Sequence, residues 1–185
     1  MNHLATSKED ILAASRDLIK ENGWAAVSIR AVASRCSVSA GTIYNYYESK
    51  ADLLSDTIES IWHEIFFHPE DEQVFHDVES CISWIYERLE YGNRQFQGFF
   101  SLHSFGFMRD EKTSGKKRMM KTWGHILNGL CEVLGNDPKV RTDVFDQEFT
   151  EKKFADILFS LILVSMIRQD YDPSSVLMLV KKTLY

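Results

Sequence analysis

The chain has 185 residues, of which 44% are hydrophobic and 26% charged, and its formal net charge at pH 7 is −6. This length allows one domain or two small ones with a substantial core, and the acidic balance excludes a protein coated with basic side chains. Residues 1–55 carry six basic and six acidic side chains, whereas the remainder carries 15 and 21. We therefore predict an acidic body joined to an electrically neutral N-terminal segment.

The cysteine pattern and the hydropathy pattern indicate a cytoplasmic protein that does not span a membrane. Cys36, Cys81 and Cys131 are odd in number and far apart, which argues against a disulfide framework. The first ten residues contain no apolar run of the kind that secretory signals have. The most apolar stretch, residues 154–167, is too short for a bilayer and contains Asp156, so we expect a buried helix there.

The first predicted helix runs from Ser7 to Glu21. Ser7 and Asp10 have the spacing of a capping box, and apolar residues recur behind them at helical intervals. Asn22 and Gly23 predict an end with a left-handed C-cap.

Residues 28–54 predict two short helices joined by a tight turn and followed at once by a longer helix. Ser28 is placed to cap the first helix, and the chain breaks at residues 37–39. Ser39 caps the second helix, while Val38 and Ile43 have the spacing of a hydrophobic staple. Ser49 opens the third, which we expect to continue from residue 50 to about residue 67.

The second short helix is predicted to be a DNA-reading helix. Its first turn is Ala40, Gly41 and Thr42, small residues that allow close approach of the backbone to DNA. Tyr44 and Asn45 follow, with Tyr46, and these polar-tipped side chains point outward rather than into a core. Such side chains can reach base edges or phosphate oxygens in a major groove.

This stretch resembles the DNA-binding domain of the tetracycline repressor (TetR) family over roughly the first third of the chain. The similarity lies in the run VSAGTIYxYYxSKxxL, from residue 38 to residue 53, preceded by residues 11–23. Two positions depart from the usual family pattern, because Ser37 replaces a glycine and Tyr47 replaces a phenylalanine. We expect Tyr47, which shares a face with Ile43, to pack inside the small domain.

The resemblance and the residue chemistry together define a set of predicted DNA contacts. Ser28 and Thr42 are expected to bind phosphate, and Arg30 to reach either a guanine or a phosphate. Asn45 is suited to adenine and Ala40 to a thymine methyl group, while the family resemblance implies that Tyr44 and Lys50 clamp the DNA backbone. The complete predicted set is Ser28, Arg30, Ser39, Ala40, Gly41, Thr42, Tyr44, Asn45, Tyr46 and Lys50.

The rest of the chain is predicted to be helical, with almost no alternation typical of strands. We expect helices over residues 71–91, 117–134, 149–168 and 174–185, a stop at His68–Asp71, a turn at Gly92–Asn93 and a charged loop over residues 110–117. The prediction is an all-α protein of about nine helices. Residues 1–50 would form the helix-turn-helix domain and residues 51–185 a helical domain for ligand binding and dimerisation.

Two further sites are predicted in this second domain. Aromatic and thioether side chains concentrate in the middle of the chain and form either a ligand cavity or a solid core: Trp62, Phe66, Trp84, Phe99, Phe100, His103, Phe107, Met120 and Trp123. The resemblance implies a small-molecule effector there. It also implies a homodimer through the last two helices, for which the predicted interface residues are Phe154, Leu158, Leu161, Ile162, Val176, Leu179 and Val180.

The sequence contains no recognisable catalytic or metal-binding motif. His63 and His68 are one residue too far apart for the zinc-protease pattern. We expect no cofactor, no metal and no enzymatic activity. The predicted function is a ligand-responsive regulator of transcription that binds a double-stranded DNA operator, acts as a repressor and is released by a small apolar or amphipathic effector. The alternative is a helical enzyme that uses the aromatic cavity.

Overall fold

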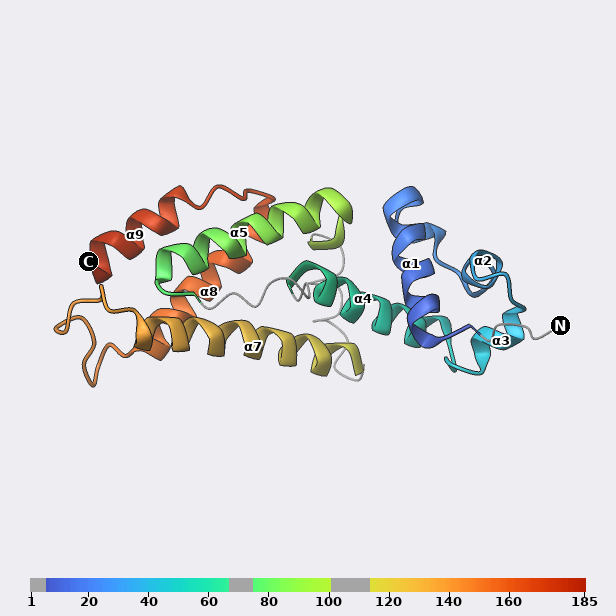
Figure 1. Cartoon of the computed structure of the whole chain (residues 1–185), viewed down its shortest axis with the longest axis horizontal. Helices are drawn as coiled ribbons and strands as arrows, with labels where there is room; N and C mark the ends of the chain where they lie inside the picture. Colours follow the sequence, from blue (N-terminus) through green and yellow to red (C-terminus); the bar gives the residue numbers. More distant parts are fainter. Residues whose placement is uncertain (1–5, 67–74, 101–113) are drawn as a thin grey trace. The chain divides into compact units, whose positions relative to one another are not determined.

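The computed structural model describes residues 6–66, 75–100 and 114–185, and within residues 114–122 it describes the backbone alone. These residues form α-helices, one 3-10 helix and connecting turns, so the fold class is all-α as predicted (Figure 1). Eight α-helices lie in the described part of the chain. Contacts divide the chain into two compact units, residues 1–64 with 95–97 (unit 1) and residues 65–94 with 98–185 (unit 2).

Unit 1 contains four α-helices, of which the first three lie in the segment predicted to be the DNA-binding domain. The elements are α1 (Lys8–Asn22), the 3-10 helix (Trp24–Ala26), α2 (Ile29–Arg35), α3 (Ala40–Tyr44) and α4 (Lys50–Phe66), whose last two residues belong to unit 2. Their apolar faces meet in a core that includes the fully buried Ile11, Val32, Ile43, Leu53 and Ile61.

Local capping explains where the helices of unit 1 begin. Ser7 and Asp10 form the predicted capping box at α1. Ser49 Oγ accepts a hydrogen bond from the amide of Asp52 at 3.2 Å and starts α4. At the end of α1, Gly23 has the predicted positive φ of 75°, but its ψ of 177° is extended rather than left-handed helical.

Unit 2 contains α5 (Val78–Gln95), α7 (Ser114–Asn136), α8 (Glu151–Arg168) and α9 (Ser174–Leu184). Aromatic and aliphatic side chains from all of these helices, together with residues 65–66 and 99–100, are buried in its core. Thr150 caps α8 with its side chain, and Gln169 ends the helix in a left-handed conformation with φ of 54°.

The predicted turn at Gly92 and Asn93 is wrong, because α5 runs through both residues to Gln95. A Cβ atom at Gly92 would lie 2.6 Å from Cδ1 of Ile65 and 3.1 Å from Cζ of Phe100. The glycine is therefore needed for close packing inside the helix and not for a change of direction. The predicted loop over residues 110–117 is also wrong in its last four residues, which belong to α7.

Two other sequence predictions differ from the structure or lie beyond it. The predicted start of a helix at residue 71 lies outside the described residues, and residues 75–77 precede α5 without helical structure. The predicted stop at His68–Asp71 also lies outside them. The boundary between the two compact units lies within α4, after residue 64. The predicted boundary between the DNA-binding and ligand-binding domains lies after residue 50, and it stays a prediction.

Candidate functional site

Two serine side chains position the short helices of unit 1. Ser28 Oγ accepts a hydrogen bond from the amide of Ala31 at 3.1 Å, and Ser39 Oγ accepts one from the amide of Thr42 at 3.2 Å. Each bond satisfies an amide that the first turn of a helix leaves without an intrahelical partner. Both helices therefore start where the sequence predicts.

The turn between α2 and α3 is a Schellman motif with serine in the position that glycine usually takes. The amide of Ser37 donates to the carbonyl of Ser34 at 3.1 Å, and the amide of Val38 donates to the carbonyl of Ala33 at 2.9 Å. Ser37 has a φ of 57°, in the left-handed region. This turn brings α3 next to α2 in the arrangement of a helix-turn-helix.

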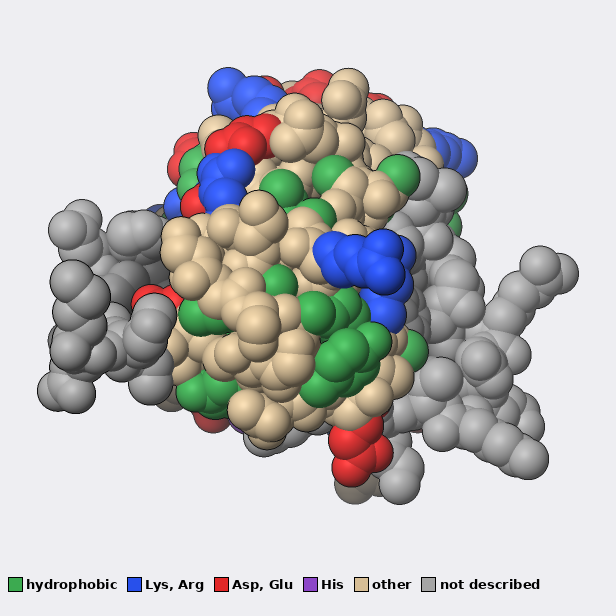
Figure 2. Space-filling view, turned by 90° about the vertical axis from the view of Figure 1, so that its right-hand side faces the viewer, with side chains coloured by type: hydrophobic (Ala, Val, Ile, Leu, Met, Phe, Trp, Pro, Cys, Tyr) green, Lys and Arg blue, Asp and Glu red, His purple; other side chains and the backbone are tan. Residues whose placement is uncertain are grey.

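The outer surface of α3 and of the residues after it is exposed as predicted. Tyr44 is 56% exposed and Tyr46 41% exposed, and Gly41 and Asn45 are also exposed. Tyr47, in contrast, is 4% exposed and packs in the core of unit 1. Figure 2 looks onto this end of unit 1, where polar surface surrounds a hydrophobic patch with basic side chains beside it.

The hydroxyl groups of three predicted contact residues already have intramolecular partners. The hydroxyl group of Tyr46 donates a hydrogen bond to the carbonyl oxygen of Thr6, so this tyrosine ties the N-terminal segment to the turn after α3. The hydroxyl groups of Ser39 and Thr42 lie 3.1 Å apart and share a hydrogen bond. Tyr44 and Asn45 are therefore the polar side chains of this surface that are best placed to meet a ligand.

The basic side chains of residues 1–55 fall into two groups. Four of them form ion pairs within unit 1: Lys8 with Asp56, Arg16 with Glu9 and Glu64, Lys20 with Glu64, and Arg35 with Glu21. The hydrogen bond from Arg35 lowers the pKa of Glu21, as expected for a charged pair. Arg30 and Lys50 are exposed and form no ion pair with any residue that the structure describes. These two cations stand at the first turns of α2 and α4.

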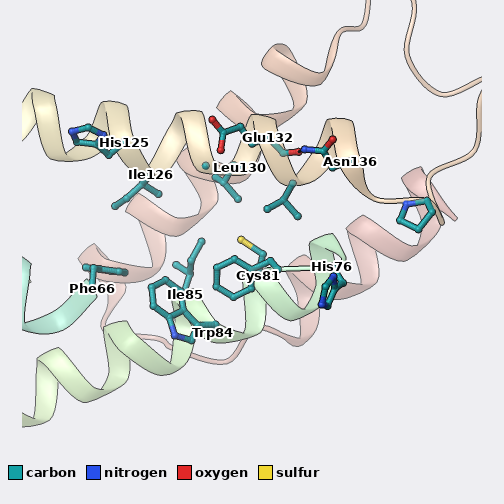
Figure 3. Close-up of a pocket in the computed structure, with 14 residues that line it drawn as sticks. Phe66, His76, Cys81, Trp84, Ile85, His125, Ile126, Leu130, Glu132 and Asn136 are labelled. Carbon is teal, nitrogen blue, oxygen red and sulfur yellow. Dashed lines mark hydrogen bonds between the residues drawn. The ribbon is translucent and has the colours of Figure 1, made fainter. Parts of the chain in front are cut away.

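A cavity of about 800 Å³ lies between α5 and α7 in unit 2. Figure 3 shows Ile126 and Leu130 of α7 pointing toward Ile85 and Cys81 of α5, with Phe66 at one end and His76 at the other. Burial raises the pKa of Cys81 to about 12, so its thiol stays protonated and serves as apolar lining. The full lining is Phe66, Phe75, His76, Cys81, Trp84, Ile85, His125, Ile126, Gly129, Leu130, Glu132, Val133, Asn136 and Pro138.

Only two of the predicted ligand-binding residues, Phe66 and Trp84, line this cavity. Trp62, Phe99 and Phe100 are buried without lining it, and Trp123 packs against Phe159 with ring centroids 5.8 Å apart. His103 and Phe107, and the side chain of Met120, lie outside what the structure describes. The prediction named Met120 and Trp123 of α7 but missed the residues of this helix that line the cavity, although Ile126, Leu130 and Val133 have the i, i+4, i+7 spacing of one helix face.

The predicted interface residues of α8 and α9 divide by exposure. Phe154, Leu158, Ile162, Val176 and Val180 are at most 6% exposed and pack in the core of their own chain. Leu161 is partly exposed and Leu179 is 38% exposed. Other apolar side chains of these helices are more exposed than the predicted set: Ile157, Val164, Ile167 and Met178. The surface available to a partner is therefore adjacent to the predicted one.

The described residues contain no group of three or more His, Cys, Asp or Glu side chains arranged to hold a metal ion. None of the helices in the same residues is long and apolar enough to cross a membrane.

The fold and the surface around α3 define a helix-turn-helix protein with a helical C-terminal unit. Residues 11–57 match the family model of bacterial regulatory proteins of the tetR family. A segment of 48 residues is 38% identical to the HTH-type transcriptional regulator UidR of Escherichia coli K12. That segment covers 26% of this chain and 24% of UidR.

Solved structures of regulators share the fold over nearly the whole chain. A TetR transcription regulator from Haloarcula marismortui has a TM-score of 0.66 and 18% identity, covering 96% of this chain and 95% of that one. The regulator FadR of Bacillus subtilis, solved in complex with stearoyl-CoA, has a TM-score of 0.62 and 19% identity, covering 97% and 100%. GusR of Salmonella enterica has a TM-score of 0.61 and 18% identity, covering 95% and 94%.

Proposed function

We propose that the protein is a transcriptional repressor that binds a double-stranded DNA operator through α2, α3 and the start of α4. The observation that carries the proposal is the exposed pair Tyr44 and Asn45 together with the unpaired cations Arg30 and Lys50. A polar helix surface flanked by free cations suits the edges of bases and the phosphates beside them. In this role the protein resides in the cytoplasm.

We infer that the operator is pseudo-palindromic because the protein acts as a homodimer. The apolar side chains exposed on α8 and α9 are suited to a second copy of the same surface. A two-fold dimer would present two copies of α3 to two half-sites of one operator.

The cavity between α5 and α7 is proposed to bind a small-molecule effector that releases the DNA. Its size and mostly apolar lining suit such a ligand, and FadR, which shares the fold, was solved with stearoyl-CoA. The ligand lowers operator affinity only to the extent that it binds more tightly to the arrangement of the protein that is free of DNA than to the arrangement that binds DNA. Ligand binding without turnover is the expected activity.

Anisotropy of labelled DNA from the region flanking the gene tests the proposal directly. We expect saturable binding that excess unrelated DNA does not abolish and that weakens steeply with salt. Asn45→Ala and Tyr44→Phe should each weaken binding. If neither substitution changes operator affinity, the assigned surface is wrong.

The two arginines of α2 provide a matched comparison. Arg30→Ala should weaken operator binding about tenfold, whereas Arg35→Ala should change it little because Arg35 is already paired with Glu21. Lys50→Ala should reduce the slope of log affinity against log salt by about 2, since a dimer loses one phosphate contact at each head. Equal losses for Arg30→Ala and Arg35→Ala would contradict the proposal that the unpaired cation is the one that contacts DNA.

A further inference from the structure

One buried carboxylate connects the two helices that form the cavity of unit 2. Asp137, which follows α7 and is 6% exposed, accepts a hydrogen bond through Oδ2 from the amide of Val78, the first residue of α5, at 2.9 Å. The same oxygen accepts a bond of 2.5 Å from the hydroxyl group of Tyr185, after α9. Asn136, immediately before Asp137, lines this end of the cavity (Figure 3). The spacing of α5 and α7 at this end therefore depends on a carboxylate that α9 also holds.

The end of α9 is bonded to the same region in two other ways. The amide of Arg141 donates to the carbonyl oxygen of Leu184 at 2.9 Å, and its guanidinium donates to that of Thr183 at 3.0 Å. These carbonyls lie in the last turn of a helix, where no intrahelical amide is available to them. Lys181 of α9 also lies 3.1 Å from a carboxylate oxygen of Glu79 in α5. A displacement of α9 would therefore be passed to the residues after α7 and to the start of α5.

The opposite side of α9 belongs to the surface that is proposed to meet a second copy of the chain. Val176 and Val180 are at most 6% exposed and pack in the core of unit 2. Met178 is 57% exposed and Leu179 38% exposed. A partner that covers these two side chains would restrict the movement of α9. One short helix therefore links the proposed dimer surface with the bonds of Asp137.

We propose that effector binding and dimerisation strengthen one another, and that Tyr185 is the positioning residue that couples them. The inference rests on the proposed function, in which the cavity is the effector site and α8 and α9 form the dimer surface. Dimerisation orders α9 and, through Tyr185, the carboxylate of Asp137. A ligand then meets a cavity end that is already ordered, so its binding loses less conformational entropy. By linkage, the ligand strengthens the dimer by the same factor.

Two tyrosines that flank α9 in the sequence provide a matched pair of hydroxyl deletions. Tyr185→Phe keeps the ring and removes the bond to Asp137, which retains its bonds from the amides of Val78 and Lys139. The variant is therefore expected to fold. The hydroxyl group of Tyr171 is buried and has no hydrogen-bond partner among the described residues. Tyr171→Phe is the control, because removal of an unpaired buried hydroxyl costs little stability.

The neutral dye N-phenyl-1-naphthylamine, whose fluorescence rises in apolar surroundings, serves as the probe of the cavity. A Cβ at either Gly129 or Gly135 would have no atom of the described residues within 4 Å, but only Gly129 lines the cavity. Gly129→Leu should therefore weaken dye binding at least tenfold, and Gly135→Leu less than twofold. Equal effects of the two substitutions would place the dye outside the cavity.

Fluorescence-detected sedimentation of the labelled full-length protein measures the dimer dissociation constant with and without saturating dye. We expect the dye to lower this constant at least fivefold in the parent protein and in Tyr171→Phe, but less than twofold in Tyr185→Phe. If Tyr185 only stabilised the fold, Tyr185→Phe would lower the stability and leave the ratio of the two constants unchanged.

A smaller ratio in the parent protein, or the same ratio in Tyr185→Phe, would overturn the inference and leave the proposed function intact. A parent protein that does not dimerise, or that does not bind the dye in the cavity, would overturn the inference together with the part of the proposed function on which it rests. Operator binding without dye, measured separately, tests the recognition of DNA by itself.

Discussion

Single residues decide the geometry of the turn between α2 and α3. Ser37 holds a φ of 57°, which costs a residue with a Cβ about 1 kcal/mol or more compared with glycine. The two hydrogen bonds of the Schellman motif keep it there. The sequence showed the departure from the family glycine, and the structure shows that the backbone conformation is kept in spite of it.

Ser37→Gly should stabilise the protein by about 0.5–1 kcal/mol, because relief of the left-handed conformation exceeds the entropy that glycine adds to the unfolded chain. Urea unfolding followed by circular dichroism measures the effect. Ser37→Ala retains the Cβ and is the control, for which no gain is expected. Equal stabilisation by alanine and glycine would argue against strain at this position.

Gly92 and Gly124 should respond to alanine in opposite directions. At Gly92 the new methyl group would collide with the buried Ile65, so Gly92→Ala should destabilise the protein by about 1–3 kcal/mol. At Gly124 no atom of the described residues would lie within 4 Å of the new methyl group, and Gly124→Ala should stabilise α7 by up to about 1 kcal/mol. Thermal unfolding compares the two variants. Stabilisation by both would mean that Ile65 relaxes away from position 92.

Capping was the most predictable feature at this scale, and close packing the least. Ser7, Ser28, Ser39 and Ser49 each bond an amide three residues further on, a signal confined to a few neighbouring residues. Gly92 could not be interpreted in the same way, because its partners Ile65 and Phe100 are fixed by the fold and not by adjacent sequence. The sequence pattern at Gly92 therefore predicted a turn, whereas the glycine is needed to leave room for the side chains of Ile65 and Phe100.

In unit 2, the carboxylates of Asp77 and Asp137 connect the start of α5 with the ends of α7 and α9. The amide of Val78 donates to the side chain of Asp137, which follows α7, and the hydroxyl group of Tyr185 after α9 donates to the same carboxylate. Asp77 caps α5 by accepting from the amide of Ser80 at 2.7 Å. Three helix ends are thus connected at one place.

The ion pair of Asp77 makes the stability of this connection dependent on pH. The hydrogen bond from Lys139, followed by that from the Ser80 amide, lowers the pKa of Asp77 to about 2. Since the folded-state pKa is below the unfolded one, the stabilisation is fully present above the unfolded value of about 4 and is lost as the pH falls through about 2.

Asp77→Asn should retain the cap and lose the ion pair, at a cost of about 1 kcal/mol at pH 6 because Lys139 is largely exposed. Urea midpoints of the two proteins should converge as the pH is lowered from 5 to 2.5. Lys139→Gln in the Asp77→Asn background should add little. A difference that is constant across this range would show that the charge of Asp77 is not the source of the stabilisation.

At the scale of the whole molecule, the sequence predicted the all-α fold and the helices of unit 2 but not which apolar residues remain exposed. The helix α8 is apolar around most of its circumference, so periodicity does not separate the side buried in its own chain from the outer one. Phe154 and Leu158 point inward, and Ile157 and Ile167 point outward, because of packing against other helices. The same limit applies to the cavity, which two helices distant in sequence form together.

Ile167→Glu should shift the proposed dimer toward monomer by at least tenfold in dissociation constant, since it places a charge in an apolar interface. Sedimentation velocity at several protein concentrations measures the shift. Lys152→Glu, a change at an exposed position about four turns away along the same helix, is the control. A monomeric parent protein, or an Ile167→Glu variant that still dimerises normally, would contradict the assignment of this surface.

The internal pairing of Lys8, Arg16, Lys20 and Arg35 has a consequence for how the proposed regulator finds its site among other DNA. Non-specific affinity comes almost entirely from cations that replace the counterions of phosphates. With most of its N-terminal cations already neutralised, the protein gains little from arbitrary sequence, so the bulk chromosome competes weakly for it. A small number of molecules per cell would then suffice to keep one operator occupied, and occupancy would respond sharply to a modest loss of specific affinity.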